Sequence, residues 1–343
     1  MKNILLFIFI SVAYFHDFDQ LYFGTEDELD IMTWNIEWFP KNNNITVDYV
    51  AQIIDALDVD VIAMQELDDR DSFDQMLNGL SGYDGYYESS WFAGLAYIYK
   101  TDTIEINDIY EIYTTSPYWN AFPRSPMVMD MNFMDTNYII INNHYKCCGD
   151  DNLNLNDDGD EENRRYIANT LLKEYIEDNF IDKNVILLGD LNDNLTDSYN
   201  DNVFQMFLDD SENYLFTDYE IAAGSNTGWS YPSWPSHLDH ILITDELFDV
   251  FQTIETIRID YFMDGGFSDY DQNISDHRPV ALKLETVIYN LGDINSDGYI
   301  DVIDIVITVN FILSNEYNSL ADLNLDNALD VLDVVQLVNM ILN

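Results

Sequence analysis

Apolar residues recur along this chain with two spacings, one typical of helices and one typical of strands. Between residues 46 and 57, Val47, Val50, Ile54 and Leu57 recur at helical spacing, so we predict a helix capped by Thr46. A second amphipathic helix is predicted at 164–180. Apolar runs bounded by polar residues predict strands at 30–36, 60–65, 94–100, 127–133, 137–142, 185–188, 237–244 and 280–284, with 127–133 and 137–142 forming a hairpin. The alternation of helices and strands predicts the α/β class.

Six short polar segments lie at or beside the ends of these strands. In order along the chain they are Trp34-Asn35-Ile36, Gln65-Glu66, Asn142-Asn143-His144, Gly189-Asp190-Leu191-Asn192, Leu238-Asp239-His240 and Ser275-Asp276-His277-Arg278-Pro279. Strand ends are where α/β folds gather their functional groups. A single Asn, Glu or Asp-His pair at such a place is usually just a solvated polar group. The ordered set predicts a phosphodiesterase site that uses a divalent metal ion.

The residue types in these segments match the needs of phosphodiester hydrolysis. The reaction needs a cation to offset charge on the phosphoryl oxygens, a group that activates water, and donors that stabilise the transition state. Hard oxygen ligands suit Mg²⁺ or Mn²⁺. The candidates are Glu66 and Asn35 at the metal ion, Asp190 and Asn192 at the attacking water, His144 and His277 as acid/base or phosphate-stabilising groups, and Asp239 and Asp276 as carboxylates that tune these imidazoles.

Histidines and basic residues are scarce, and many of them lie in or beside these segments. Four of the five histidines are at positions 144, 237, 240 and 277. For His237 and His240 we expect a hydrogen-bonded structural role. A local phosphate-attracting patch could be formed by Arg124, Lys146, Arg164, Arg165 and Arg278, although Arg164 and Arg165 could equally brace their helix.

Composition limits the class of protein. The chain has 343 residues, 47% hydrophobic and 14% aromatic, so it can bury the core of one large domain and leave room for a small second one. Its formal charge of −51 arises from 64 acidic and 13 basic residues. Self-repulsion on this scale predicts a need for salt or bound cations, and it excludes loose electrostatic adhesion to DNA or to an anionic membrane. A polyanionic substrate must be attracted locally.

The N-terminus has the pattern of a secretory signal. Lys2 precedes an apolar run at 4–15, which is too short to span a bilayer. We expect a signal and leader at 1–24 and a secreted mature protein without a transmembrane segment; a buried first strand is the alternative. The two cysteines, Cys147 and Cys148, are adjacent, which excludes a conventional disulfide framework. A vicinal disulfide, two free thiols and a bond between chains all stay open.

Taken together, the six segments resemble those of the endonuclease/exonuclease/phosphatase superfamily, which has the deoxyribonuclease-I-like fold. The similarity runs from about residue 30 to residue 285. It implies a four-layer α/β/β/α sandwich, with the catalytic domain at 25–287. The roles that it implies are Asn35, Glu66 and Asp276 at a Mg²⁺ or Mn²⁺ ion, Asn142 and His144 handling phosphate and proton, Asp190 and Asn192 positioning the nucleophile, Asp239 orienting His277, and Arg124 facing the substrate.

The C-terminal segment 290–343 carries two repeats of a calcium-loop pattern. The expected ligands are the side chains at loop positions 1, 3, 5, 9 and 12 and the carbonyl at position 7. They are Asp293, Asn295, Asp297, Tyr299, Asp301 and Asp304 in the first loop, and Asp322, Asn324, Asp326, Ala328, Asp330 and Asp333 in the second. Position 6 is Gly298 and Asn327, two residue types that tolerate a left-handed backbone.

An apolar helix is predicted after each loop, at 305–313 and 334–342. The repeat of 29 residues, from 293 to 322, leaves no room for a complete helix–loop–helix pair at each site. This repeat, with Asp at position 12, resembles a type I dockerin, a small all-α domain. The resemblance implies folding on two Ca²⁺ ions and binding to a cohesin module. By analogy Val302, Ile303, Val331 and Leu332 would face that partner.

These features predict a secreted, metal-dependent phosphodiesterase, foremost an extracellular nuclease that hydrolyses DNA or RNA by metal-assisted attack of water. A second reading is a phosphodiesterase or phosphatase for lipid head groups or small phosphates, whose substrate could contact the aromatic segment 229–235. A third is a non-catalytic cohesin-binding component, which the completeness of the site disfavours. We expect a monomer, secreted or held at the cell surface through its dockerin.

Overall fold

The computed structural model describes residues 18, 20–87, 89, 93–286, 291–295, 297–324 and 326–342. The chain forms two compact units, and unit 1 ends at Thr286. The apolar run predicted to be a signal at 4–15 lies outside the described residues. Within the described ranges, no helix combines the length and the apolarity that crossing a membrane requires.

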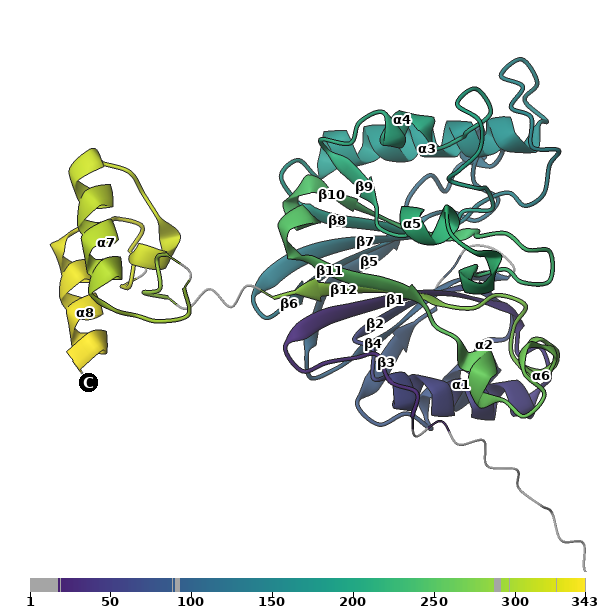
Figure 1. Cartoon of the computed structure of the whole chain (residues 1–343), viewed down its shortest axis with the longest axis horizontal. Coiled ribbons are helices and arrows are strands. Elements are labelled where there is room, and N and C mark those ends of the chain that lie inside the picture. Colours follow the sequence, from purple (N-terminus) through teal and green to yellow (C-terminus); the bar gives the residue numbers. More distant parts are fainter. Residues whose placement is uncertain are drawn as a thin grey trace, which may run out of the picture. The chain divides into compact units, whose positions relative to one another are not determined.

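Two six-stranded sheets form the centre of unit 1 (Figure 1). The first has the order β11-β12-β1-β2-β4-β3, with bounds Phe251–Thr256, Val280–Glu285, Glu28–Phe39, Val61–Leu67, Gly94–Lys100 and Tyr83–Tyr86. The second has the order β5-β6-β7-β8-β10-β9, with bounds Ile104–Glu111, Met127–Phe133, Thr136–His144, Asn184–Asp190, Asp239–Thr244 and Tyr214–Phe216. The pairs β1·β2 and β7·β8 are parallel, and the predicted hairpin is β6·β7.

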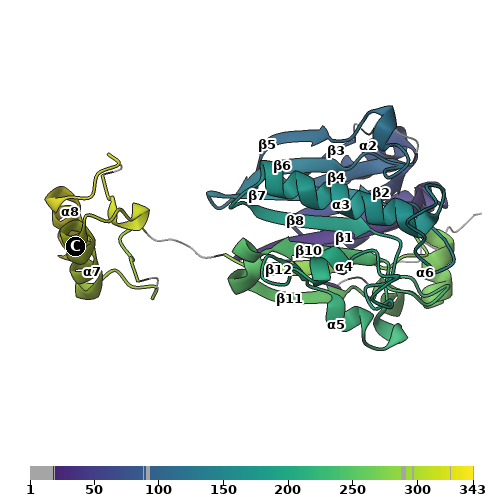
Figure 2. The same ribbon diagram turned by 90° about the horizontal axis from the view of Figure 1, so that it is seen from above.

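Helices cover the outer faces of both sheets. Figure 1 shows α1 and α2 beside the first sheet and α3 and α4 beside the second, and Figure 2 shows α3 lying over the strands of its sheet. The helices of unit 1 are α1 (Asn44–Leu57), α2 (Arg70–Leu77), α3 (Glu161–Asn179), α4 (Gln205–Leu208), α5 (Tyr219–Ala222) and α6 (Phe267–Asn273). The layers therefore follow the order helix, sheet, sheet, helix.

Residue alternation along the strands explains these layers. In β1, Leu29 and Ile31 join the core between the two sheets, whereas Met32 and Trp34 join the core between the first sheet and α1. Successive side chains of a strand point to opposite faces, so both faces of the central strands are buried. Each fully buried apolar side chain contributes about 1.5–3 kcal/mol. The predicted α/β/β/α sandwich is confirmed.

Two helix starts differ from the sequence prediction. Helix α3 begins at Glu161 because the Asp160 side chain accepts the N–H of Asn163 at 2.7 Å and caps the helix. Thr46, predicted as a cap, lies inside α1, where its hydroxyl donates to the carbonyl of Asn273 at 2.7 Å. A tertiary contact therefore uses the hydroxyl that local reasoning assigned to capping.

The packing of unit 1 begins before residue 25, the predicted start of the catalytic domain. Phe18, Leu21 and Phe23 are buried in the core beside α1. The N–H groups of Phe23 and Gly24 both donate to the carbonyl of Leu57, at 3.1 and 2.7 Å. Residues 18 and 20–24 thus pack with unit 1, while the leader predicted at 1–24 stays a prediction.

Unit 2 repeats one hydrogen-bond pattern in its two loops. In the first loop, Asp304 accepts the N–H groups of Ile294 and Asn295; in the second, Asp333 accepts the corresponding groups at 323 and 324. Gly298 and Asn327, at position 6, have φ of 82° and 62°, the left-handed conformation that was predicted. Helices α7 (Val302–Ser314) and α8 (Val331–Leu342) begin three residues earlier than predicted, within the loop pattern.

Candidate active site

The parallel strand pairs bring four predicted residues together between the sheets. Asn35 and Glu66 lie near the carboxyl ends of β1 and β2, and His144 and Asp190 are register partners at the carboxyl ends of β7 and β8. The amide of Asn35 donates to Asp190 Oδ2 at 2.9 Å and to Glu66 Oε1 at 3.4 Å. His144 Nε2 lies 3.4 Å from Asp190 Oδ2 and 3.8 Å from Glu66 Oε1. The site therefore spans both sheets.

His277 joins the same cluster from the loop before β12. Its Nδ1 lies 2.7 Å from Asp239 Oδ2, and its Nε2 lies 3.8 Å from Asp190 Oδ2. Ser275 holds the loop, because its hydroxyl donates to the carbonyl of Asn35 at 2.7 Å and accepts the N–H of His277 at 3.0 Å. This geometry agrees with the predicted pairing of Asp239 with His277.

Backbone irregularities aim two of the polar side chains. Glu66 has a φ of 63°, and the strand register shifts between Met64 and Leu67. Such a bulge turns a side chain away from the regular pleat. Asn192 has a φ of 54°, and its N–H donates to Asp190 Oδ1 at 3.2 Å. Strained positions of this kind concentrate at functional sites.

The two histidines of the cluster differ in protonation state. Burial and the charges of Arg124 and His277 lower the pKa of His144 well below its usual value. Burial alone would lower the pKa of His277 as well, but the charges of Asp239 and Asp190 outweigh it and raise that pKa to about 10. At neutral pH, His144 is neutral and His277 is cationic.

The pKa of the Asp190 carboxyl lies near neutral pH. Burial raises its pKa, the charge of His277 opposes this, and the charges of Asp239 and Glu66 add to the increase, so that the pKa is about 7. A carboxyl group that titrates near neutral pH suits proton transfer at that pH. The position of Asp190 beside the attacking water stays a prediction.

The oxygen donors in this cluster fit a hard divalent cation. Glu66 keeps 15% of its side chain exposed, and its carboxylate lies beside the amide of Asn35. Asp276 keeps 25% exposed, with Oδ1 4.0 Å from His277 Nε2. Carboxylate and amide oxygens suit Mg²⁺ or Mn²⁺. The ligand atoms of Asp190, Asp239 and His277 also lie within 4.8 Å of one another, but a cationic imidazole bound to Asp239 is a poor metal ligand.

Asn142 does not have the substrate-facing position that the resemblance implied. Its side chain is fully buried, donates to the carbonyls of Met64 and Ala96 at 3.0 and 3.1 Å, and accepts from Gln65 at 2.8 Å. Both amide hydrogens are thus used within the protein. Asn142 joins the two sheets through these bonds, and its side chain is not accessible to a substrate in this structure.

Most of the predicted basic patch is occupied by internal contacts. Arg278 donates to Asp260 Oδ2 at 2.8 Å, and Arg165 donates to Asp193 Oδ2 at 2.8 Å. Both arginines are buried. Arg164 donates to the carbonyl of Asn120. Arg124 is half-buried, its Nε donates to the carbonyl of Ala93 at 3.4 Å, and its charge contributes to the lowered pKa of His144.

Sequence reasoning missed Glu37 and the supporting role of Gln65, and it named Tyr231 only as part of the aromatic segment 229–235. Glu37 accepts the N–H of Asp276 at 2.8 Å and forms an ion pair with Lys41. The ring of Tyr231 packs on that of His277 with centroids 4.7 Å apart. Gln65 lies in the second polar segment and supports the site by donating to Asn142 Oδ1 at 2.8 Å. A signal for Glu37 was present in the sequence, since this residue follows the first segment directly.

The adjacent cysteines Cys147 and Cys148 lie beside Arg165. Both cysteines are exposed free thiols with sulfur atoms 2.8 Å apart. Arg165 donates to the carbonyl of Cys148 at 2.6 Å. The structure therefore corresponds to the free-thiol alternative.

Three solved structures show how widely this fold is shared. D. rerio TDP2 in complex with a single-stranded DNA product is 13% identical, with a TM-score of 0.58, over 76% of this chain and 100% of that one. The catalytic domain of human Nocturnin with a bound sulfate anion is 16% identical, with a TM-score of 0.54, over 75% and 93%. A mannosyl-6-phosphatase from Bacteroides thetaiotaomicron is 14% identical, with a TM-score of 0.53, over 75% and 100%. Identities this low show a common fold alone.

A sequence comparison with curated proteins finds no match. The profile of one protein family matches residues 32–277, which include five of the six polar segments and the first three residues of the sixth. Since this match covers most of the chain, the protein belongs to the Endonuclease/Exonuclease/phosphatase family, whose members hydrolyse phosphoesters with divalent metal ions.

Proposed function

We propose that unit 1 is a metal-dependent phosphodiesterase that hydrolyses nucleic acid. The observation that carries this proposal is the convergence of Asn35, Glu66, His144 and Asp190 from two sheets, beside the His277–Asp239 pair. Every group that the reaction requires is within one cluster: oxygen ligands, a carboxyl near neutral pKa and a cationic donor.

In this proposal Glu66, Asn35 and Asp276 hold Mg²⁺ or Mn²⁺, which when bound offsets negative charge on the phosphoryl oxygens. Asp190 accepts the proton of the attacking water, and the amide of Asn192 orients that water. His277 is kept cationic by Asp239, so its Nε2–H donates to a phosphoryl oxygen where charge develops.

Two aromatic side chains support a nucleic-acid substrate. Tyr231 covers His277, and Trp38 is about half exposed, with its backbone N–H donating to Glu66 Oε2 at 3.2 Å. Aromatic faces beside a phosphate site can stack on nucleobases, a contact of about 1–3 kcal/mol per base. The same rings could contact a sugar or a lipid head group.

The net charge favours a second candidate, a small phosphoester. A protein with a formal charge of −51 repels long polyanions, and most of its basic residues near the site are paired internally. A phosphomonoester or a lipid head group carries less charge and meets less repulsion. A non-catalytic role is the third reading, and the complete set of site residues weighs against it.

The deciding experiment compares substrates under controlled metal and salt. The protein is incubated with plasmid DNA, RNA, a lipid phosphodiester and a sugar phosphate, with Mg²⁺, Mn²⁺ or chelator, at low and high salt. Glu66→Gln is the matched control, because it removes the charge of one predicted ligand and keeps its shape.

We expect metal-dependent cleavage of nucleic acid that chelator and Glu66→Gln abolish. Turnover of the lipid or sugar phosphate alone would assign the second candidate. Turnover of no substrate, with the protein folded, would bring forward the non-catalytic reading.

We also infer that unit 2 is a calcium-binding dockerin and that the protein is exported. The matching loop geometry of the two repeats supports the first inference. Val302, Ile303, Val331 and Leu332 are each more than half exposed, as a partner-binding surface requires. The signal-like N-terminus supports the second inference. Calcium titration of the unfolding temperature, and N-terminal sequencing of the exported protein, test them.

A further inference from the structure

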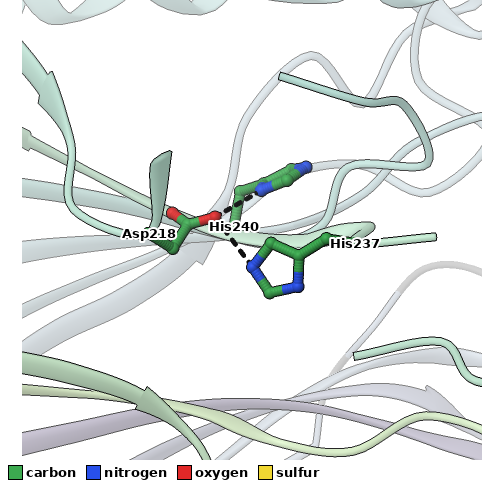
Figure 3. A group of neighbouring side chains, drawn as sticks. All are labelled: Asp218, His237 and His240. Atoms are coloured by element: carbon green, nitrogen blue, oxygen red, sulfur yellow. Dashed lines mark hydrogen bonds and ion pairs between the residues drawn. The ribbon is translucent and has the colours of Figure 1, made fainter. Parts of the chain in front are cut away.

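A buried group of three polar side chains lies beside the active site. Figure 3 shows Asp218 between His237 and His240, and none of the three exposes more than 1% of its surface. Asp218 Oδ2 lies 2.6 Å from His240 Nδ1 and 3.1 Å from His237 Nε2. The other oxygen of Asp218 accepts the N–H of Ile241 at 3.0 Å. The carboxylate is therefore surrounded by donors.

Two histidines and a carboxylate could in principle bind a metal ion, but the hydrogen bonds argue against it. His237 Nδ1 accepts the N–H of Ser230 at 3.1 Å, so the proton of a neutral imidazole must be on Nε2, the atom that faces Asp218. His240 has an acceptor at both nitrogens, Asp218 Oδ2 and the carbonyl of Asp193 at 2.9 Å. A metal ligand needs a free nitrogen lone pair at the shared position.

Charge compensation explains how this group can be buried. With both nitrogens donating, His240 is an imidazolium ion, and it neutralises Asp218. Burial alone would raise the pKa of Asp218 and lower that of His240, yet their mutual attraction shifts both in the opposite directions. A buried ion pair is tolerated when further hydrogen bonds satisfy it, as they do here.

The group is hydrogen-bonded to both chain segments that carry the catalytic carboxylates. His240 donates to the carbonyl of Asp193, which follows Asn192 directly. On the other side, Ser230 donates to His237, and the hydroxyl of Ser230 accepts the N–H groups of Leu238 and Asp239, at 3.1 and 3.2 Å. The segments 190–193 and 238–239 are thus tied to one buried ion pair.

We propose that Asp218, His237 and His240 are positioning residues that hold Asp190–Asn192 and Asp239 in their reactive geometry, chiefly through the hydrogen bond from His240 to Asp193. This inference rests on the proposed hydrolytic function of unit 1. A displacement of about 1 Å at reacting groups costs roughly a hundredfold in rate. Residues that prevent such a displacement therefore affect kcat.

Two substitutions of His240 separate its two hydrogen bonds. The amide nitrogen of Asn overlaps ring Nδ1, so His240→Asn keeps the donor to Asp218 and loses the donor to Asp193. The amide nitrogen of Gln overlaps ring Nε2, so His240→Gln does the reverse. Thr244→Val is the control for lost stability, because Thr244 is buried at the far end of the same strand, with its hydroxyl bonded to the Lys183 carbonyl.

The measurements are kcat and KM on the substrate identified for the parent, thermal unfolding, and amide hydrogen exchange at Tyr145 and Leu191. These two N–H groups donate to the carbonyls of Asp190 and Leu238. We expect His240→Asn to lower kcat by about tenfold or more with little change in KM, and to accelerate both exchange rates. Both substitutions remove the imidazolium charge, so their difference reports the hydrogen bond to Asp193: His240→Gln should keep a kcat at least about threefold above that of His240→Asn, and Thr244→Val should retain kcat and both exchange rates.

Unchanged kcat and unchanged exchange rates in His240→Asn would overturn the inference. Equal losses of kcat in all three variants, each explained by the fraction of unfolded protein, would overturn it as well. If the folded parent cleaves none of the substrates but His240→Asn still accelerates exchange, the proposed function fails and the positioning role stands. Should His240→Asn not fold, Ser230→Ala tests the second contact with the same readouts, and normal exchange at Leu191 together with normal kcat would then refute the inference.

Discussion

The pair His277–Asp239 offers the sharpest test of the proposed site. Asp239→Asn removes a negative charge 2.7 Å from His277 Nδ1 and keeps an oxygen that can accept its N–H. In the proposed function His277 must be cationic to donate to a phosphoryl oxygen. The substitution therefore changes one property, the pKa of His277, more than it changes shape.

The size of the effect follows from the geometry. Opposite charges about 4 Å apart attract by about 4 kcal/mol at an effective dielectric constant of about 20. One pKa unit corresponds to about 1.4 kcal/mol, so the pKa of His277 should fall by about 3 units from its value of about 10. At pH 8 the imidazolium would then be about a tenth of the population, while at pH 6 it would still predominate. We expect a loss of kcat that grows about tenfold between these two pH values.

Stability has a matching dependence on pH. The raised pKa of His277 contributes stability that is fully present below the unfolded value of about 6.5 and is lost as the pH rises through about 10. Asp239→Asn should remove most of this contribution, so the difference in unfolding free energy between parent and variant should shrink as the pH rises towards 10.

The assay is a pH–rate profile of parent and variant from pH 5.5 to about pH 9 at saturating Mg²⁺. Asp108→Asn is the matched control, because Asp108 is an exposed carboxylate of β5 in the same sheet. A loss of activity that is constant across this range would refute the assignment of His277 as a cationic donor. A loss of kcat of equal size in Asp108→Asn would show that the effect comes from the change in net charge and not from the contact with His277.

The remaining predictions concern binding, folding and the second unit. Glu66→Gln should lower kcat at least about a hundredfold with unchanged unfolding temperature, as measured by single-turnover hydrolysis and calorimetry. Trp38→Ala should raise KM for nucleic acid about five- to 150-fold and leave KM for a small phosphodiester unchanged, if the ring stacks on a base. Leu172→Ala, in the core under α3, should cost about 2–5 kcal/mol in urea unfolding without changing kcat per folded molecule. Asp293→Ala with Asp322→Ala should abolish the calcium dependence of folding in unit 2 and leave hydrolysis intact, as circular dichroism and activity with and without Ca²⁺ would report; lost hydrolysis would show that the units are coupled.

The sequence by itself determined the class of fold and most of the members of the site. Periodicity located the central strands, because their side chains must alternate between two buried faces. Polar segments directly after those apolar runs identified Glu66, His144 and Asp190, since the carboxyl ends of parallel strands share one edge of a sheet. The calcium-loop spacing likewise predicted the left-handed residues Gly298 and Asn327.

The tertiary structure alone decided how these residues are used. Asn142 belongs to a site segment, yet its amide points inward, because three polar atoms from strands β2 and β4 of the other sheet satisfy it there. Arg165 and Arg278 were candidates for a local phosphate-attracting patch, but each is bound to a buried carboxylate. Contacts such as Asn35 with Asp190, 155 residues apart, depend on which sheet edges meet. Local pattern determines a strand and the face of each side chain, whereas pairing across 155 residues is set by the packing of the whole domain.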